Sequence, residues 1–158
     1  MIATFLSSLT LADEAATASL AANLAQRARP GDVITLAGPL GAGKTSFARF
    51  FIAALGVHDE VPSPTFTLVQ TYEAASGLIW HFDLYRLTTP DEARELGLEE
   101  ALIDGIVLIE WPDRLGSSLP RERLDVILAP GPAVTARLAT LHGSARWTTA
   151  LAEILRNG

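Results

Sequence analysis

The order of hydrophobic and polar positions along this chain predicts strands and helices in alternation. The apolar runs at residues 33–37 and 106–109 are short and partly β-branched, which is typical of buried strands. Apolar side chains recur at helical spacing over residues 12–29, 46–55 and 147–155, so each stretch predicts a helix with one face on the core. Strands that alternate with helices predict an α/β fold whose central strands are parallel.

Polar residues, glycine and proline mark where helices are expected to begin and end. Thr10 is the expected N-cap of the helix over residues 12–29, because an acid, Asp13, follows three residues later. Gly56 is expected as the C-cap of the second helix, since glycine tolerates the left-handed backbone found there. Pro90 lies near the expected first position of another helix, with acidic residues in its first turn.

Alternating apolar residues and turn residues predict the other strands. Residues 67–72 and 78–83 predict an antiparallel hairpin around the Ala-Ala-Ser-Gly segment at residues 74–77. Further elements are expected as a short helix at 99–103 and as strands at 4–9, 124–128 and 134–141. The expected architecture is a single α/β domain over residues 1–158, with three layers and a mixed sheet that contains an inserted antiparallel hairpin.

The composition restricts the compartment and the kind of partner. The chain has 158 residues, enough for one domain with a full core, and no cysteine, which excludes disulfides and cysteine metal sites. Its first residues lack a basic, apolar leader and no stretch approaches the length of a membrane span, so we expect a cytoplasmic protein. A net charge of −6 disfavours binding nucleic acid along a broad basic surface, although a basic partner could make that contact.

One segment carries a specific chemical motif. Residues 38–45 match the phosphate-binding pattern G-x-x-x-x-G-K-[ST], and they lie between an expected strand and an expected helix, as the motif requires. Backbone N–H groups of such a loop bind the α- and β-phosphates of ATP, and the lysine reaches the β- and γ-phosphates. Lys44 is the only lysine of the chain, and its compact ammonium suits this turn better than a planar guanidinium.

The motif also assigns roles to its neighbours. The Thr45 hydroxyl is expected to bind Mg²⁺, and the helix that follows directs its positive dipole end at the phosphates. The residues expected to contact the nucleotide belong to the loop, the position after it and one distant threonine: Gly38, Pro39, Leu40, Gly41, Ala42, Gly43, Lys44, Thr45, Ser46 and Thr65.

Two acidic residues end expected strands. Glu110 follows the apolar run at residues 106–109, and Asp83 follows residues 78–82. Phosphoryl transfer rests mainly on positioning and charge neutralisation, so Mg²⁺ needs carboxylates near the β- and γ-phosphates. We therefore expect Asp83 and Glu110 to bind Mg²⁺, directly or through water, or to orient the attacking water, with Lys44 as the third catalytic residue. The alternative is that each acid is solvated or caps the next element.

Four further positions have weaker signals. Thr65 and its neighbour Thr67 lie in a proline-framed loop that could sense the γ-phosphate or simply form a turn. Trp111 could stack near the nucleotide or pack in the core, and Arg86 could reach phosphate or form a structural ion pair. His81 is expected to pack in the hairpin, because a lone histidine is more often structural than catalytic.

Four segments in this order and spacing resemble one family, TsaE (also called YjeE), the bacterial ATPase of tRNA threonylcarbamoyladenosine (t6A) biosynthesis. They are residues 38–45, 63–69 (Ser-Pro-Thr-Phe-Thr-Leu-Val), 81–87 (His-Phe-Asp-Leu-Tyr-Arg-Leu) and 109–112 (Ile-Glu-Trp-Pro). The resemblance covers about residues 13–128, and the tail from Ala129 carries no recognised motif. Pro39 stands where the family usually has Asp, which removes an acid from the loop, and Ser46 stands where it has Thr.

The resemblance implies a small cytosolic ATPase that uses ATP and Mg²⁺ and is weakly active alone. It implies action with TsaD and TsaB, which transfer the threonylcarbamoyl group to adenosine 37 of tRNAs that read ANN codons, so tRNA would be met only through partners. ATP hydrolysis would drive turnover of the TsaB–TsaD complex. The family pattern assigns Lys44 and Thr45 to phosphate and Mg²⁺, Asp83 and Glu110 to metal and hydrolysis, and residues 63–67 to a switch-like segment.

Two other functions remain open at this point. A small-molecule P-loop kinase has a similar length and the same loop, but it usually needs a mobile lid with several arginines. The close arginine pairs of this chain, at residues 27 and 29 and at 121 and 123, lie in no obvious lid. A nucleotide-dependent binding module that does not hydrolyse ATP is disfavoured by the presence of both Asp83 and Glu110.

Overall fold

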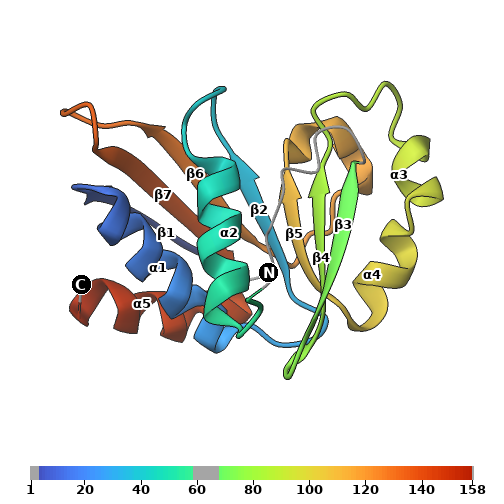
Figure 1. The fold of residues 1–158 in the computed structure, drawn as a ribbon, viewed down its shortest axis with the longest axis horizontal. Helices are drawn as coiled ribbons and strands as arrows, with labels where there is room; N and C mark the ends of the chain where they lie inside the picture. The colour runs from blue at the N-terminus through green and yellow to red at the C-terminus, as the bar shows by residue number, and fades with distance from the viewer. Residues whose placement is uncertain (1–3, 59–67, 158) are drawn as a thin grey trace.

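A single seven-stranded sheet organises the computed structural model, which describes residues 4–58 and 68–157 (Figure 1). The strand order is β1-β7-β6-β2-β5-β4-β3. Along the chain the elements are β1 (Thr4–Leu11), α1 (Glu14–Arg27), β2 (Val33–Ala37), α2 (Lys44–Ala54), β3 (Val69–Ala74), β4 (Gly77–Asp83), α3 (Asp91–Glu95), α4 (Leu98–Asp104), β5 (Ile106–Glu110), the 3₁₀ helix η1 (Pro112–Ser118), β6 (Leu124–Pro130), β7 (Arg137–Ser144), the 3₁₀ helix η2 (Ala145–Trp147) and α5 (Thr148–Asn157).

The sheet is mixed, which confirms the predicted α/β class. Strand β2 is parallel to both of its neighbours, β5 and β6, and β4 is parallel to β5. The predicted hairpin is β3–β4, and its turn consists of Ala75 and Ser76 because Ala74 already pairs with Gly77. Parallel pairing of β4 with β5 brings the carboxyl ends of both strands to the same edge of the sheet as the end of β2.

Two hydrophobic cores lie on opposite faces of the sheet. Alternate residues of β5 divide between them: Ile106 and Leu108 join the core under α1, α2 and α5, while Val107 and Ile109 join the core under α3, α4 and η1. Each such fully buried side chain contributes roughly 1.5–3 kcal/mol relative to exposure. The second core includes no residue of β1, β6 or β7 among those described, so helices cover both faces only over the β2–β5–β4 half.

Some expected limits were wrong, and strand pairing explains two of them. The ladder between β1 and β7 extends to Leu11, so Thr10 lies in a strand and Asp13 is the N-cap instead, where its Oδ1 accepts from the Ala16 N–H at 2.9 Å. The helix ends at Arg27 because Arg29 precedes a proline, which disfavours helical backbone. The expected strand over residues 134–141 begins only at Arg137, because residues 131–136 form the turn from β6.

The tail without recognised motifs completes the sheet. Strand β7 pairs with β6 on one side and with β1 on the other, so the N-terminal strand joins the sheet through β7. Trp147 and Leu151 are buried in the first core. Arg146 donates to Asp32 Oδ2 at 2.7 Å and to the Arg27 carbonyl at 2.8 Å, which ties this segment to the start of β2. Within the described residues, no helix combines the length and the apolar character that crossing a bilayer requires.

Candidate functional site

A glycine-rich loop (residues 38–45) connects β2 to α2 at the edge where the parallel strands end (Figure 1). Gly38, Gly41 and Gly43 have φ angles of +140°, +79° and +101°, which side chains disfavour. A Cβ atom on Gly38 would lie 2.2 Å from the Leu128 carbonyl oxygen, so only glycine fits between the loop and β6. Gly43 caps α2 without a side chain, and the first N–H groups of a helix attract anions.

Lys44, the first residue of α2, extends its side chain back across this loop. Its Nζ donates to the carbonyl oxygens of Gly38 at 2.7 Å and Pro39 at 2.9 Å, and it lies 4.3 Å from the ring centroid of Trp111. Burial lowers the pKa of Lys44, whereas the charges of Glu110 and Asp83 raise it. The ammonium is therefore held in a largely dry site between the loop and two carboxylates.

The two strand-end acids lie side by side. Asp83 is the register partner of Glu110 in the parallel pair β4–β5, and both side chains are buried. The Thr45 hydroxyl donates to Glu110 Oε1 at 2.9 Å, and Asp83 Oδ1 accepts from the Tyr85 N–H at 3.1 Å. Neither acid is a solvated strand end, and the structure brings both together with the first two residues of α2.

His81 lies at this site and not only in the hairpin. Its ring is fully buried, its Nε2 lies 2.7 Å from Glu110 Oε2, and its Nδ1 has no hydrogen-bond partner among the described residues. Sequence reasoning treated His81 as packing alone. The period of two along β4, which places His81 on the same face as Asp83, was the available signal.

Trp111 packs against the second core, which was one of the two alternatives for this residue, and it also lies beside Lys44. It has a left-handed backbone (φ +60°) directly after β5, which is uncommon for a bulky residue. Its ring packs partly on the second core and also contacts Tyr85, with ring centroids 4.9 Å apart. The aromatic pair forms one wall beside Lys44.

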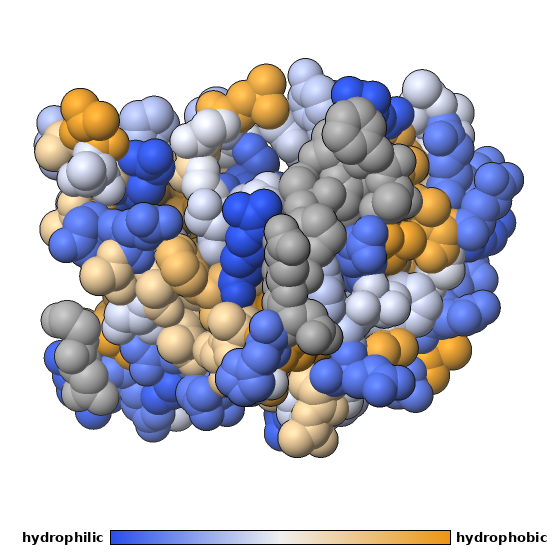
Figure 2. Space-filling view, viewed as in Figure 1, coloured by the Kyte–Doolittle hydropathy of each residue, from blue (hydrophilic) through white to orange (hydrophobic). Residues whose placement is uncertain are grey.

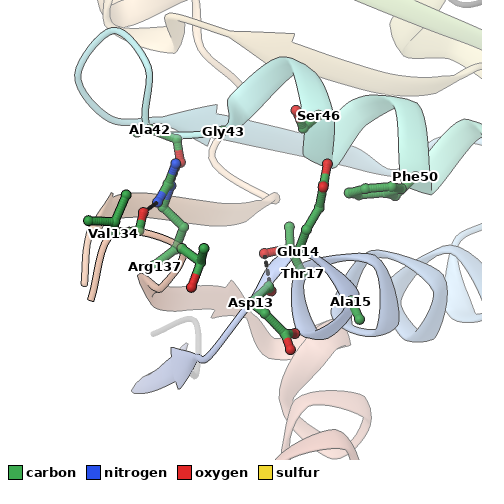
Figure 3. Close-up of a pocket in the computed structure, with 11 residues that line it drawn as sticks. Asp13, Glu14, Ala15, Thr17, Ala42, Gly43, Ser46, Phe50, Val134 and Arg137 are labelled. Atoms are coloured by element: carbon green, nitrogen blue, oxygen red, sulfur yellow. Dashed lines mark hydrogen bonds between the residues drawn. The ribbon is translucent and has the colours of Figure 1, made fainter. Parts of the chain in front are cut away.

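Two cavities flank the glycine-rich loop. The smaller, about 390 Å³, has a wall made of the loop, the start of α2, the two acids, the aromatic pair and two arginines: Leu40, Gly41, Gly43, Lys44, Thr45, Ser46, Asp83, Glu110, Tyr85, Trp111, Arg86 and Arg137. The larger, about 540 Å³, lies between α1, α2 and the β6–β7 turn (Figure 3). Both cavities share Gly43, Ser46 and Arg137.

Arg137 is a residue that sequence reasoning missed. Its Nε donates to the Ala42 carbonyl at 3.1 Å and its Nη1 to Val134 O at 3.1 Å and Ala136 O at 2.9 Å, so it fastens the β6–β7 turn to the loop. Leu40 and Val134, exposed by 70% and 95%, are nearby, and Figure 2 shows hydrophobic surface at the tips of the β2–α2 loop and the β6–β7 turn. No local motif marks Arg137, because its role depends on strand order.

Thr65 and the rest of residues 63–67 lie outside the described residues.

Comparison with known proteins gives a consistent result. The family model described as "Threonylcarbamoyl adenosine biosynthesis protein TsaE" matches residues 11–137. This chain belongs to the TsaE family. TsaE of Rickettsia conorii is 46% identical over 120 residues, covering 75% of this chain and 69% of that protein. TsaE of Bacillus subtilis is 42% identical over 113 residues, covering 71% and 70%.

A solved structure extends the similarity over almost the whole chain. The crystal structure of Bacillus subtilis YdiB superposes with a TM-score of 0.78 at 30% identity, and the match covers 99% of this chain and 97% of YdiB. The TsaE resemblance is therefore confirmed, and the matched region reaches Arg137, beyond the motifs that suggested it. As a TsaE-family member, the chain is a component of tRNA threonylcarbamoyladenosine biosynthesis.

Proposed function

We propose that this TsaE-family chain is a Mg²⁺-dependent ATPase, a single domain over residues 1–158 that hydrolyses ATP to ADP and phosphate within the t6A machinery. One observation carries the proposal: Lys44 and Thr45 begin a helix directly beside two buried carboxylates, Asp83 and Glu110. A glycine-rich loop alone could be a turn. The same loop with an ammonium, a hydroxyl and two acids around a 390 Å³ cavity is suited to phosphoryl transfer.

The glycine-rich loop and the start of α2 would bind the phosphates. Backbone N–H groups of Gly41, Gly43 and Ser46 are suited to oxyanions, and the helix dipole adds to this attraction. Lys44 is already directed across the loop by two carbonyl oxygens, so little side-chain freedom is lost when it contacts phosphate. Thr65 stays a predicted γ-phosphate contact.

The donor set beside the loop fits Mg²⁺. The Thr45 hydroxyl and the carboxylates of Glu110 and Asp83 are oxygen ligands, which this ion prefers. In the described part of the chain, no group of three or more acidic, histidine or cysteine side chains could hold a metal alone. Mg²⁺ usually keeps several waters and binds one or two carboxylates plus substrate phosphates. The ion would neutralise charge on the β- and γ-phosphate oxygens.

The burial of the two acids supports the same proposal. Asp83 and Glu110 are buried carboxylates in a cavity that Lys44, Arg86 and Arg137 also line. Burial reduces the screening of charge by water, so these carboxylates would attract a bound cation strongly. Within this cavity, we assign Asp83 and Glu110 to metal binding and to orientation of the attacking water, and Lys44 to the phosphate charge that develops during transfer.

The larger cavity would hold the nucleoside. It continues from the smaller cavity through Gly43 and Ser46, next to the expected α-phosphate position. Its wall combines the polar side chains of Asp13, Glu14 and Thr17 with the ring of Phe50, which suits sugar hydroxyls and a base (Figure 3). A nucleotide that spans both cavities would contact the loop from its base to its γ-phosphate.

We further propose that TsaB and TsaD stimulate this ATPase in the cytoplasm and that hydrolysis drives their turnover. Family membership supports a role in t6A formation. The net charge of −6 makes tRNA contact through partners more favourable than direct contact.

The test is a reconstituted reaction with TsaB, TsaD, tRNA and the threonylcarbamoyl donor. We expect partners to raise ATP turnover and multiple-turnover modification to require this chain. If modification proceeds unchanged without the chain and partners leave its ATPase rate unchanged, the proposal is wrong and a small-molecule kinase becomes the better explanation. Phosphate release without acceptor molecules separates those two functions.

A further inference from the structure

We infer that His81 is a positioning residue of this site, which holds Glu110 so that Oε1 stays against the Thr45 hydroxyl. The inference rests on the proposed function, because Glu110 and Thr45 are the proposed metal-binding pair. The contact between His81 Nε2 and Glu110 Oε2 measures 2.7 Å, and that between Thr45 Oγ1 and Glu110 Oε1 measures 2.9 Å. Each carboxylate oxygen therefore has its own partner, and together the partners fix the plane of the carboxylate.

The surroundings leave His81 little freedom. It lies in the middle of β4 with its ring fully buried, and Glu110 is only 2% exposed, so bulk water cannot orient this carboxylate. Both side chains point to the α2 side of the sheet, since β4 and β5 are parallel and His81 pairs with Leu108, two residues before Glu110. A strand that is paired on both sides, as β4 is with β3 and β5, is a rigid support, which suits the precise placement of a ligand.

The chemistry of the carboxylate identifies which atom donates. An ionised carboxylate can only accept, so a hydrogen bond at Glu110 Oε2 requires the proton on His81 Nε2. Nδ1 is buried without a partner among the described residues, which is unfavourable. Ile79, on the same face of β4, shows that this strand accommodates an apolar side chain there. A histidine at position 81 weakens the core, and its contact with Glu110 is the compensating interaction.

The consequence concerns the metal. Mg²⁺ demands nearly ideal octahedral geometry, and hydrogen bonds from outer partners commonly orient the carboxylates that bind metals. Asp83 is short and already accepts from the Tyr85 N–H. Glu110 has one more rotatable bond, so it depends more on a fixed donor such as His81.

Three variants separate donation from packing. His81→Leu keeps an apolar volume but cannot donate, and His81→Gln offers an amide N–H at about the reach of Nε2. His81→Asn keeps polarity but is too short to reach Glu110. The measurement is calorimetric affinity for a non-hydrolysable ATP analogue with Mg²⁺ and with EDTA, and the ratio of the two affinities reports the metal contribution.

We expect the ratio to fall at least fivefold in His81→Leu and His81→Asn, to stay within twofold of the wild type in His81→Gln, and affinity in EDTA to be equal in all. Thermal unfolding identifies any variant that does not fold; if His81→Leu fails, Asn against Gln decides. The inference is overturned if His81→Leu and His81→Asn keep the wild-type affinity ratio, or if the ratio falls as far in His81→Gln as in those two variants. Either result leaves the proposed function intact. A wild-type protein without metal-dependent binding overturns both.

Discussion

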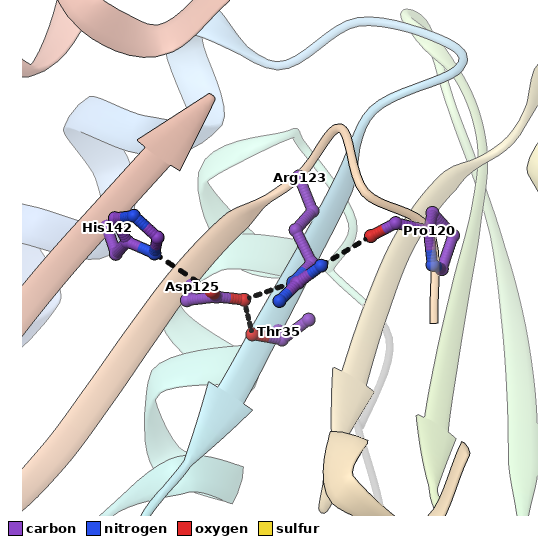
Figure 4. A network of polar contacts seen from close by, with 5 residues as sticks. All are labelled: Thr35, Pro120, Arg123, Asp125 and His142. Atoms are coloured by element: carbon purple, nitrogen blue, oxygen red, sulfur yellow. Dashed lines mark hydrogen bonds and ion pairs between the residues drawn. The ribbon is translucent and has the colours of Figure 1, made fainter. Parts of the chain in front are cut away.

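Two carboxylates on this sheet, Glu110 and Asp125, each gather a threonine hydroxyl, a histidine ring and a cationic side chain, yet their surroundings differ. Asp125 Oδ1 accepts from Thr35 Oγ1 at 2.6 Å and from Arg123 Nε at 2.8 Å, and its Oδ2 lies 3.5 Å from His142 Nδ1 (Figure 4). The residue types nearly repeat those around Glu110. A list of side chains would therefore not separate the two clusters.

Burial and position separate them. The Glu110 cluster lies at the carboxyl end of β5, under α2 and beside the 390 Å³ cavity. Asp125 lies near the start of β6 on the opposite face, where the His142 side chain is 43% exposed. That face of β1, β7 and β6 also exposes Leu6, Ile127 and Leu138, and no helix covers it in the described part of the chain. Solvent screens the electrostatic interactions of the Asp125 cluster, whereas those of the enclosed Glu110 cluster are screened much less.

The partners of each carboxylate differ as well. Arg123 binds Asp125 directly and also donates to the Pro120 carbonyl at 2.7 Å, so the charge of Asp125 is balanced within the network. Lys44 instead donates to carbonyl oxygens of the loop and interacts electrostatically with two acids, Glu110 and Asp83. A binding site therefore needs charge that remains available to a ligand. Matched substitutions in the two clusters test this.

The largest difference between the two clusters is expected when the cations, Lys44 and Arg123, are replaced and ATP affinity is measured. Lys44→Ala should weaken ATP binding by about 2–5 kcal/mol, because it removes a desolvated charge from the proposed phosphate site. Arg123→Ala should leave affinity unchanged within twofold. Isothermal calorimetry measures both. Lys44→Arg should fail as well, since a planar guanidinium does not fit the loop. Undiminished affinity in Lys44→Ala would contradict the assignment of the loop.

The second-largest difference is expected in ATP turnover when the carboxylates, Glu110 and Asp125, are neutralised. Glu110→Gln keeps the shape of the side chain and removes its charge, so ATP turnover should fall at least tenfold, a barrier increase of about 1.4 kcal/mol or more. Asp83→Asn should behave similarly. Asp125→Asn is the control and should retain turnover within twofold. Steady-state phosphate release measures all three, and equal losses in Glu110→Gln and Asp125→Asn would show that position on the sheet does not matter.

The two threonines should separate metal binding from stability. Thr45→Val removes a proposed metal ligand, so the Mg²⁺ concentration for half-maximal turnover should rise severalfold, about 1 kcal/mol. Thr35→Val should leave Mg²⁺ dependence unchanged but lower the free energy of unfolding by about 1 kcal/mol, since a buried hydroxyl loses its contact with Asp125. Magnesium titrations and denaturant unfolding measure the two effects. The comparison fails if Thr35→Val also shifts the magnesium requirement.

The smallest effect is expected from replacing His142, the histidine of the solvent-exposed Asp125 cluster. His142→Ala should change the free energy of unfolding by less than about 1 kcal/mol, because its contact with Asp125 is long and solvent-exposed. Nucleotide affinity and magnesium dependence should not change. Urea unfolding measures the free energy of unfolding, and calorimetry measures nucleotide affinity. A large loss of affinity would mean that a change on the exposed face alters nucleotide binding at the cavity.

Much of the proposed site could be predicted from local pattern. The loop was recognisable because a strand, a glycine-rich turn and a helix follow each other within about twenty residues, and the backbone geometry is local. Asp83 and Glu110 were found because acids at the ends of parallel strands meet at one sheet edge. The start of α2 at Lys44, two residues earlier than expected, depends on the cap at Gly43.

The family, the α/β class and the residues of the loop follow from the amino-acid sequence alone, because each depends on neighbours along the chain. The strand order is visible only in the folded chain, and so are the contacts of His81 with Glu110 and of Arg137 with Ala42. The folded chain also shows which carboxylate cluster is enclosed and which faces solvent, since helices from distant segments cover only part of the sheet. Hydrophobic packing is not directional, so a local pattern specifies which face is buried but not what lies on it.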